Sequence, residues 1–324
     1  MPKSIVFLIL TFLLSWPVAF CAFSSGMVPY SGRWFAVAVF FMFTPAISAV
    51  VTQRFLFREE LIRPLGISFR PNRWFLVAAL LPAFLAVGST AVSYLFPAVS
   101  LTSDPMQSNA LLLFGPSLSE TQLAELRRSA TELPLHPFIL ILISGTVAGL
   151  TVNGIAGFGE ELGWRGFLLR ETGRLGFWGS SLVIGIIWGL WHIPFIIHGH
   201  NYPGHPVAGI FMMVLWTVLF APLIAYVRIR SNSVVSAAIM HGVLNGTAMA
   251  PAAVLRGGDS LETGVMGLAG MLVLCGLNLV LLGFGGARVW HERWMAHGFC
   301  GDIAAEEPLV CGRHIPAIKE QANG

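Results

Sequence analysis

The chain has 324 residues, of which 55% are hydrophobic and only 11% charged, with a net charge of +3. A soluble domain carries about 25% charged residues, so this composition excludes a water-soluble globule. The small positive charge is spread over short loops, which excludes a basic nucleic-acid-binding surface. The mean hydropathy of +0.74 indicates an integral membrane protein whose first partner is the lipid bilayer.

Apolar runs recur along most of the chain. A helix needs about 20 apolar residues to cross a bilayer. We therefore predict an all-α fold, a polytopic transmembrane bundle of about eight spanning helices. The first run is longer than a signal-peptide core and no small-x-small cleavage site follows it, so we expect it to be retained. The predicted spans are residues 4–24, 34–57, 74–97, 137–157, 177–198, 207–227, 233–252 and 264–287.

Residues 98–136 form the one long polar connection. Ser119 and Gln122 have the spacing of a helix capping box. Leu123, Leu126 and Arg127 follow, which predicts a short amphipathic helix at the membrane surface. This segment could be a simple loop cover or a lid over a substrate entrance.

Arginine placement predicts the orientation. Cytoplasmic loops of membrane proteins are enriched in Lys and Arg. An even number of spans then places both termini in the cytoplasm of a multi-pass protein of the cell or inner membrane. The arginines expected on the cytoplasmic side are Arg58, Arg63, Arg70, Arg73, Arg165, Arg170, Arg174, Arg228, Arg230, Arg288 and Arg293.

Two groups of metal-ligating side chains lie outside the core motifs. In the tail, Cys300 and Cys311 could bind zinc with nearby histidines, but their spacing matches no zinc finger. We expect a polar tail with reduced thiols. The loop histidines are expected to be solvated rather than to form a metal site. The histidines concerned are His291, His297 and His314 in the tail, and His198, His200 and His205 in the loop.

Two adjacent glutamates, Glu160 and Glu161, lie among apolar residues. Neighbours on a helix point about 100° apart, so the two carboxylates face different partners. Glu161 can pair with Arg165 one turn later, which leaves Glu160 directed elsewhere. A carboxylate in apolar surroundings is a candidate general base. The alternative is a pair of solvated glutamates at a helix start.

Three further polar residues lie within apolar spans. His192 follows two tryptophans, and an ionisable residue inside a membrane is by default a functional candidate. His241 and Asn245 share one helix face and can donate hydrogen bonds to one point. The alternative for each is a polar contact that joins neighbouring helices.

Together these motifs resemble those of the CPBP family, the CAAX prenyl protease and bacteriocin-processing proteins, also called Abi intramembrane proteases. Their order, spacing and membrane context match over about residues 137–252. Trp188 stands where the family usually has Phe. The resemblance implies that Glu161 and Arg165 are structural partners. The motifs are Glu160-Glu161-x-x-x-Arg165, Trp188-x-x-x-His192 and His241-x-x-x-Asn245.

The resemblance also implies a hydrolytic site. Glu160 would be the general base that activates water, and His192 would help to bind that water. His241 and Asn245 would stabilise the oxyanion. These roles are what amide hydrolysis requires, namely a base and donors placed where negative charge develops.

A metal is an open alternative. Glu160, His192 and His241 could hold zinc and leave a position for water, as in a metalloprotease. The chain has no His-Glu-x-x-His helix. A metal-free glutamate mechanism and a zinc mechanism therefore both remain.

The sequence predicts an intramembrane endopeptidase. Its substrate would be a membrane-associated peptide or protein, and in the prenyl-protease branch it would be cut just after a lipidated Cys. The alternatives are a non-catalytic immunity or scaffold protein, and a proton-coupled transporter. A transporter would predict repeats in both halves, whereas the polar motifs lie in the second half only. The predicted parts are N-terminal helices and loop (1–136), catalytic helical core (137–252), last span (253–288) and polar tail (289–324).

Overall fold

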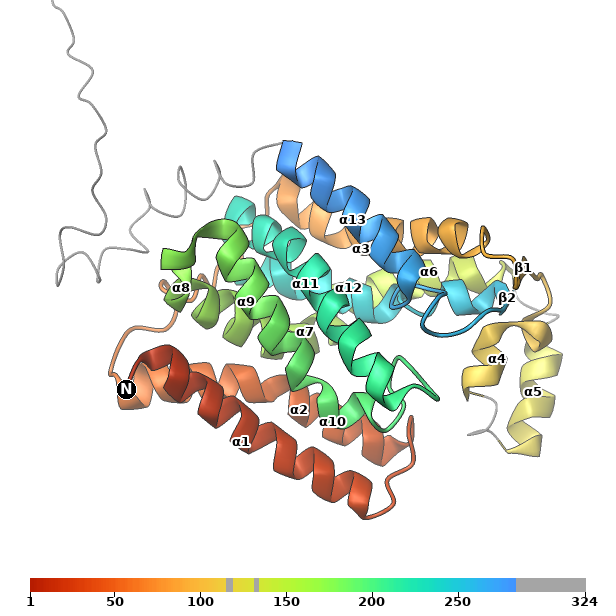
Figure 1. Cartoon of the computed structure of the whole chain (residues 1–324), viewed down its shortest axis with the longest axis horizontal. Coiled ribbons are helices and arrows are strands. Elements are labelled where there is room, and N and C mark those ends of the chain that lie inside the picture. The colour runs from red at the N-terminus through yellow and green to blue at the C-terminus, as the bar shows by residue number, and fades with distance from the viewer. Residues whose placement is uncertain (115–118, 131–133, 284–324) are drawn as a thin grey trace, which may run out of the picture.

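The computed structural model describes residues 1–114, 119–130 and 134–283. Over these residues the protein is a bundle of α-helices with one two-stranded sheet at its edge (Figure 1). The predicted all-α class is confirmed. The helices are α1 (Lys3–Ser24), α2 (Gly32–Val50), α3 (Arg73–Ser93), α4 (Asn109–Phe114), α5 (Glu120–Ala130), α6 (Pro137–Leu150), α7 (Val152–Glu161), α8 (Leu169–Glu171), α9 (Gly176–Trp191), α10 (Ile193–Ile196), α11 (Pro206–Ser231), α12 (Val234–Thr247) and α13 (Leu268–Gly283).

Every predicted span contains a helix, but not every helix is long enough to cross a bilayer. Among the described residues, five helices have the length and composition to do so, and the bent pair of α6 and α7 would make a sixth. This pair changes direction by 58°. α12 has 14 residues and α13 has 16, which is short for a full span. The count of eight therefore stays a prediction.

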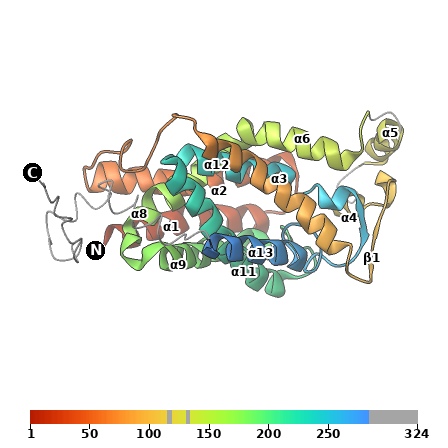
Figure 2. The ribbon, with the colours of Figure 1, turned by 90° about the horizontal axis from the view of Figure 1, so that it is seen from above.

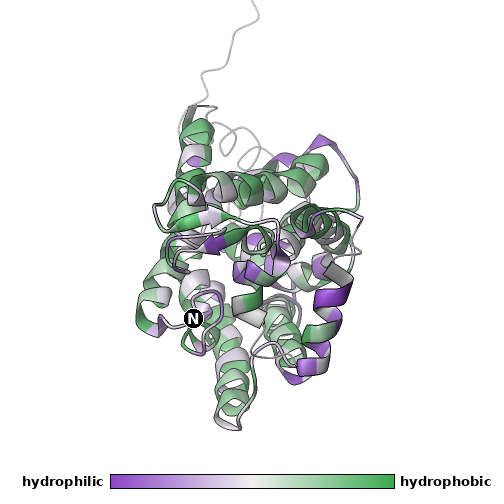
Figure 3. Cartoon of the chain, turned by 90° about the vertical axis from the view of Figure 1, so that its right-hand side faces the viewer, coloured by the Kyte–Doolittle hydropathy of each residue, from purple (hydrophilic) through white to green (hydrophobic). Residues whose placement is uncertain are grey.

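The outer faces of the helices are apolar. Leu13 is 64% exposed, Leu76 62% and Phe211 71%, and apolar colouring predominates on the helices (Figure 3). A soluble protein rarely exposes apolar patches of this extent. The chain is therefore an integral multi-pass membrane protein whose outer faces contact lipid.

Local signals fix several helix ends. The side chains of Ser31, Asn72 and Ser233 accept hydrogen bonds from backbone N–H groups and so cap α2, α3 and α12. Pro194 lies in the first turn of α10. Because proline cannot donate to the turn before it, α9 ends at Trp191 and the chain breaks at His192.

α12 lies inside the bundle, in contact with α3, α6, α7 and α11 (Figures 1 and 2). Two glycines allow its close approach to α7. A Cβ on Gly157 would lie 2.7 Å from the carbonyl oxygen of Ala238, and one on Gly242 would lie 2.5 Å from the nitrogen of Gly154. These backbones therefore meet without side chains between them, as is common between membrane helices.

The long connection between α3 and α6 has structure of its own. Strand β1 (Val99–Leu101) pairs antiparallel with β2 (Leu255–Gly257), and α4 and α5 lie at the same end of the molecule (Figure 1). The predicted capping box is confirmed. Ser119 Oγ accepts from the Gln122 N–H at 3.2 Å, and Gln122 Oε1 accepts from the Ser119 N–H at 2.8 Å. A lid role for this segment stays a prediction.

Two further expectations concern the C-terminal tail and the arginines. The Cys and His residues of the tail lie outside the described residues. Arg165 and Arg228, taken as loop residues that mark orientation, are 1% and 0% exposed. They are therefore interior side chains and carry no topological signal, and the orientation of the termini stays a prediction.

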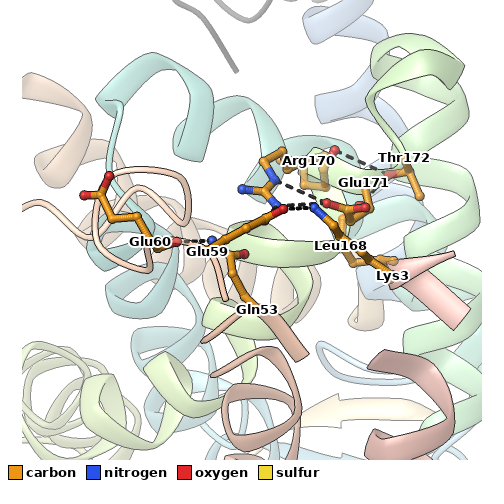
Figure 4. A network of polar contacts seen from close by, with 9 residues as sticks. Lys3, Gln53, Glu59, Glu60, Leu168, Arg170, Glu171 and Thr172 are labelled. Atoms are coloured by element: carbon orange, nitrogen blue, oxygen red, sulfur yellow. Dashed lines mark hydrogen bonds and ion pairs between the residues drawn. The ribbon is translucent and has the colours of Figure 1, made fainter. Parts of the chain in front are cut away.

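A network of charges joins three distant segments at one end of the bundle (Figure 4). Glu59 forms ion pairs with Lys3 at the start of α1 and with Arg170 on α8, the latter at 3.3 Å. Arg170 also pairs with Glu171 at 3.0 Å. Gln53 donates to the backbone carbonyl of Glu60. The network holds α1 and the loop after α2 against the helix that continues from Glu160 and Glu161.

We expect Glu59→Gln to lower the free energy of unfolding by about 0.5 to 1 kcal/mol, because partly exposed ion pairs contribute about that much. Loss of intrinsic tryptophan fluorescence during denaturation in detergent measures the change. Glu120→Gln, on the exposed start of α5, is the control and should leave the midpoint unchanged. Equal midpoints for both variants would show that the network does not stabilise the bundle.

Candidate active site

The glutamate pair lies where α7 changes into a π-helix. Glu160 and Glu161 are the last residues of α7, and the π-helix η4 (Leu162–Leu168) follows directly. π-Helical turns are rare in proteins overall, but those that occur are often found at functional sites. Glu160 and Glu161 are 2% and 0% exposed. The alternative of two solvated glutamates is therefore wrong.

Glu161 is the centre of a buried ion-pair group. Its Oε1 accepts from Arg165 Nη1 at 3.0 Å, which is the pair that the sequence spacing predicts. The same oxygen lies 2.8 Å from Nδ1 of His241 on α12. Glu161 thus joins its own helix to α12, and it orients the imidazole ring as second carboxylates do in many catalytic sites.

Glu160 faces a different set of partners. The Nε1–H of Trp188 on α9 donates to its Oε2 at 2.7 Å. Its Oε1 lies 3.7 Å from Nε2 of His241. That distance is too long for a direct hydrogen bond. An oxygen atom of water or substrate can, however, lie within hydrogen-bond distance of both Glu160 Oε1 and His241 Nε2. The structure therefore brings Glu160 and His241 together from separate elements.

His192 approaches the group through Trp188. The Nδ1 atom of His192 is 2.8 Å from the Trp188 carbonyl oxygen. Since a carbonyl only accepts, Nδ1 carries the proton, and Nε2 of the neutral ring is an acceptor. The His192 ring is half-buried, with its centroid 5.0 Å from that of Trp191.

Asn245 lies on α12 one turn after His241, as predicted, but in a different environment. His241 is 3% exposed, whereas Asn245 is exposed. It lies on the same helix face as His241, one turn farther from the buried group. Glu160, Glu161, Arg165 and His241 are thus in direct contact, while His192 and Asn245 flank them.

With both glutamates ionised, the net charge of this group depends on the state of His241. The carboxylates of Glu160 and Glu161 and the guanidinium of Arg165 sum to −1. A protonated His241 brings the buried group to zero, which reduces the penalty of burying its charges. In that state Nδ1 donates to Glu161 and Nε2 carries a hydrogen that points toward the Glu160 side.

The predicted zinc ligands do not form a ligand group. Among the described residues, no three His, Cys, Asp or Glu side chains are close enough together to hold a metal ion. Glu160 and His241 are close, but His192 does not complete a set with them. Zinc dependence therefore stays a prediction.

The three histidines of the loop after α10 lie in different environments. His198 stacks on Phe23 with centroids 3.9 Å apart. Burial beside Trp34 lowers the pKa of His200 to about 4, so its ring is neutral. His205 Nε2 lies 2.7 Å from Asp259 Oδ2. His198 is exposed and the His205–Asp259 contact is partly exposed, so only His200 departs from the expectation of a solvated loop.

A cavity of about 240 Å³ lies near that loop, lined in part by Asn109, Asn201, Met249 and Ser260. None of the predicted catalytic residues lines it. Met249, four residues after Asn245, comes just after the end of α12. The cavity therefore lies beyond the C-terminal end of α12, farther along the chain direction of this helix than the glutamate group.

Sequence reasoning missed the role of Trp188. It identified the residue as an aromatic exchange beside the site, whereas the indole contacts the candidate base directly. The available signal was the residue type itself, because a buried Trp N–H usually finds an acceptor. Which acceptor it finds depends on how α9 packs against α7, and the sequence pattern does not give that.

The comparisons with known proteins point to the same region. The family model described as "Type II CAAX prenyl endopeptidase Rce1-like" matches residues 134–247, which contain all of these side chains. Over these residues the chain is thus similar to CAAX prenyl endopeptidases. One relative is the CAAX prenyl protease 2 of Methanococcus maripaludis, which is 26% identical over 193 residues. The match covers 56% of this chain and 63% of that relative, so it spans less than two thirds of the relative's length.

Proposed function

We propose that this protein is a CPBP-family intramembrane endopeptidase that uses Glu160 to activate water. The observation that carries the proposal is the buried contact group in which Glu160 and His241, from α7 and α12, face each other at 3.7 Å. A buried, charge-balanced group of this kind is costly to maintain, and it has the parts that amide hydrolysis needs.

Water activation involves two acceptors. A water molecule donates one hydrogen to Glu160 Oε1 and the other to Nε2 of the neutral His192 ring. Glu160 takes the proton as the water oxygen attacks the scissile carbonyl carbon, and a C–O bond forms. Glu160 then transfers this proton to the amide nitrogen as the C–N bond breaks, which yields a carboxylic acid and an amine; proton exchange between them leaves a carboxylate and an ammonium group.

The developing oxyanion is stabilised by two donors on α12. The Nε2–H of protonated His241 and the side-chain amide of Asn245 donate to the carbonyl oxygen as it becomes negative. Glu161 holds His241 through Nδ1 at 2.8 Å, so the donor needs little reorganisation during the reaction. Burial of His241 away from bulk water strengthens its interaction with the oxyanion.

The substrate is proposed by analogy with the relative. Its name, CAAX prenyl protease 2, suggests a peptide that ends in a prenylated Cys followed by three residues, cut just after that Cys. The apolar outer surface of the helices suits a substrate held in the membrane by its lipid. Digestion of matched prenylated and unprenylated peptides, followed by mass spectrometry, tests this specificity.

Asn245→Ala is expected to lower kcat about 100-fold, because removal of one oxyanion donor has an effect of that order. Since Asn245 is exposed, the free energy of unfolding should change little. Cleavage kinetics and denaturation of the same preparation measure both. The control is Asn278→Ala on α13, which removes an amide bonded to the Leu219 carbonyl and should keep full activity. A normal kcat for Asn245→Ala would remove this residue from the oxyanion site.

A further inference from the structure

We propose that Trp188 is a positioning residue: its indole N–H holds Oε2 of Glu160, so that Oε1 is the oxygen that takes the proton from water. This inference rests on the proposed function and adds a residue that the family's usual motif, with Phe at this position, does not supply.

The hydrogen bond is short and enclosed. Trp188 Nε1 lies 2.7 Å from Glu160 Oε2, and both residues are 2% exposed. A bond between an N–H donor and a carboxylate away from water is stronger than a neutral one. It fixes the rotation of the carboxylate about its last single bond. The oxygen left over is Oε1, which faces His241.

The indole itself packs against a cation and a second aromatic ring. The Arg165 guanidinium lies over the Trp188 ring, 4.4 Å from its centroid, in cation–π geometry. The ring of Phe220 on α11 lies 6.3 Å away. Arg165 is in turn bonded to Glu161, so both glutamates depend on the same guanidinium.

Trp188 also orients the second group that contacts water. Its backbone carbonyl accepts from His192 Nδ1 at 2.8 Å, which sets the tautomer of that ring. One residue therefore fixes the base through its side chain and the water-binding histidine through its backbone. Only the first of these contacts depends on the side chain being Trp.

Trp188→Phe isolates the side-chain contact, because Phe keeps the ring face and the backbone carbonyl and loses only the N–H donor. We expect kcat to fall about 10- to 100-fold, which corresponds to the loss of one hydrogen bond to a charged group. KM should stay within roughly twofold, because the bond does not touch substrate. The acid limb of the pH–rate profile should move to higher pH, because the ionised carboxylate has lost a donor.

Trp216→Phe is the matched control. Trp216 is 1% exposed and its Nε1–H donates to the Val265 carbonyl at 2.7 Å, away from the glutamates. This variant loses the same atoms and one indole hydrogen bond, so it should lose similar stability while keeping the wild-type kcat and pH profile. If Trp188→Phe matched Trp216→Phe in kcat and in pH profile, the positioning role would be overturned.

A second measurement does not depend on activity. In ¹H–¹⁵N spectra of the protein in detergent, the indole signal missing from Trp188→Phe identifies Trp188. We expect that signal downfield in the wild type and shifted upfield in Glu160→Ala. An unshifted signal would overturn the contact. If the wild type cleaved no peptide although the signal shifted, the proposed function and with it the positioning role would fail, while the hydrogen bond would stand.

Discussion

Glu160→Gln is expected to lower the cleavage rate by about 100- to 10,000-fold, the range that general-base catalysis contributes. The amide keeps the size and hydrogen-bonding shape of the carboxylate but cannot take a proton from water. The Trp188 N–H can still donate to the amide oxygen, so the fold should persist. Initial rates of peptide cleavage by purified protein in liposomes measure the effect.

Glu171→Gln is the control for this experiment. Glu171 lies eleven residues after Glu160, on α8, where it pairs with Arg170 outside the glutamate group. Its replacement should leave the rate unchanged. If Glu160→Gln kept more than about a tenth of the wild-type rate, Glu160 would not be the base.

The two alternative functions predict other outcomes. A cellular phenotype that survived Glu160→Gln would favour a scaffold, and substrate flux without hydrolysis would favour a transporter.

Arg165→Met is expected to lower the free energy of unfolding by about 3 to 5 kcal/mol, the effect of breaking a buried ion pair by removing one partner. Arg165 and Glu161 are 1% and 0% exposed. The variant leaves the Glu161 carboxylate with His241 alone and removes the cation over Trp188. Denaturant titration in detergent, followed by circular dichroism, measures the loss.

Two variants check the origin of that loss. Arg128→Met removes an arginine whose pairing with Glu125 is exposed, with side chains 72% and 63% accessible, and it should have little effect. Arg165→Lys keeps the charge but not the planar fork, so it should recover only part of the stability. A loss below about 1 kcal/mol in Arg165→Met would contradict the buried pair.

Local patterns predicted what depends on sequence spacing. The Glu161–Arg165 pair follows from a separation of four residues on one helix, although it spans the start of a π-helix. The capping box at Ser119 is equally local. The long apolar runs correctly predicted a helix in each span, because backbone N–H and C=O groups in lipid must form hydrogen bonds with one another.

The remaining features depend on packing between distant segments. The contacts of His241 with Glu161 and of Trp188 with Glu160 join α7 to α12 and α9, 80 and 28 residues apart. The break between α6 and α7 at Thr151 has no proline near it, since residues 138–157 contain none. The ring contacts of His198 and His200 likewise depend on Phe23 and Trp34, which belong to the first two helices.

We propose that this site hydrolyses a peptide bond with water activated by Glu160. The most direct test is digestion of a prenylated peptide ending in Cys and three residues, beside its unprenylated twin, in water enriched in ¹⁸O. The wild type should yield a new C-terminal carboxylate that carries one ¹⁸O, and Glu160→Gln should yield none. The same digest with a zinc chelator separates a metal-free from a zinc-dependent site. Unlabelled product, or equal product from wild type and Glu160→Gln, would contradict the account.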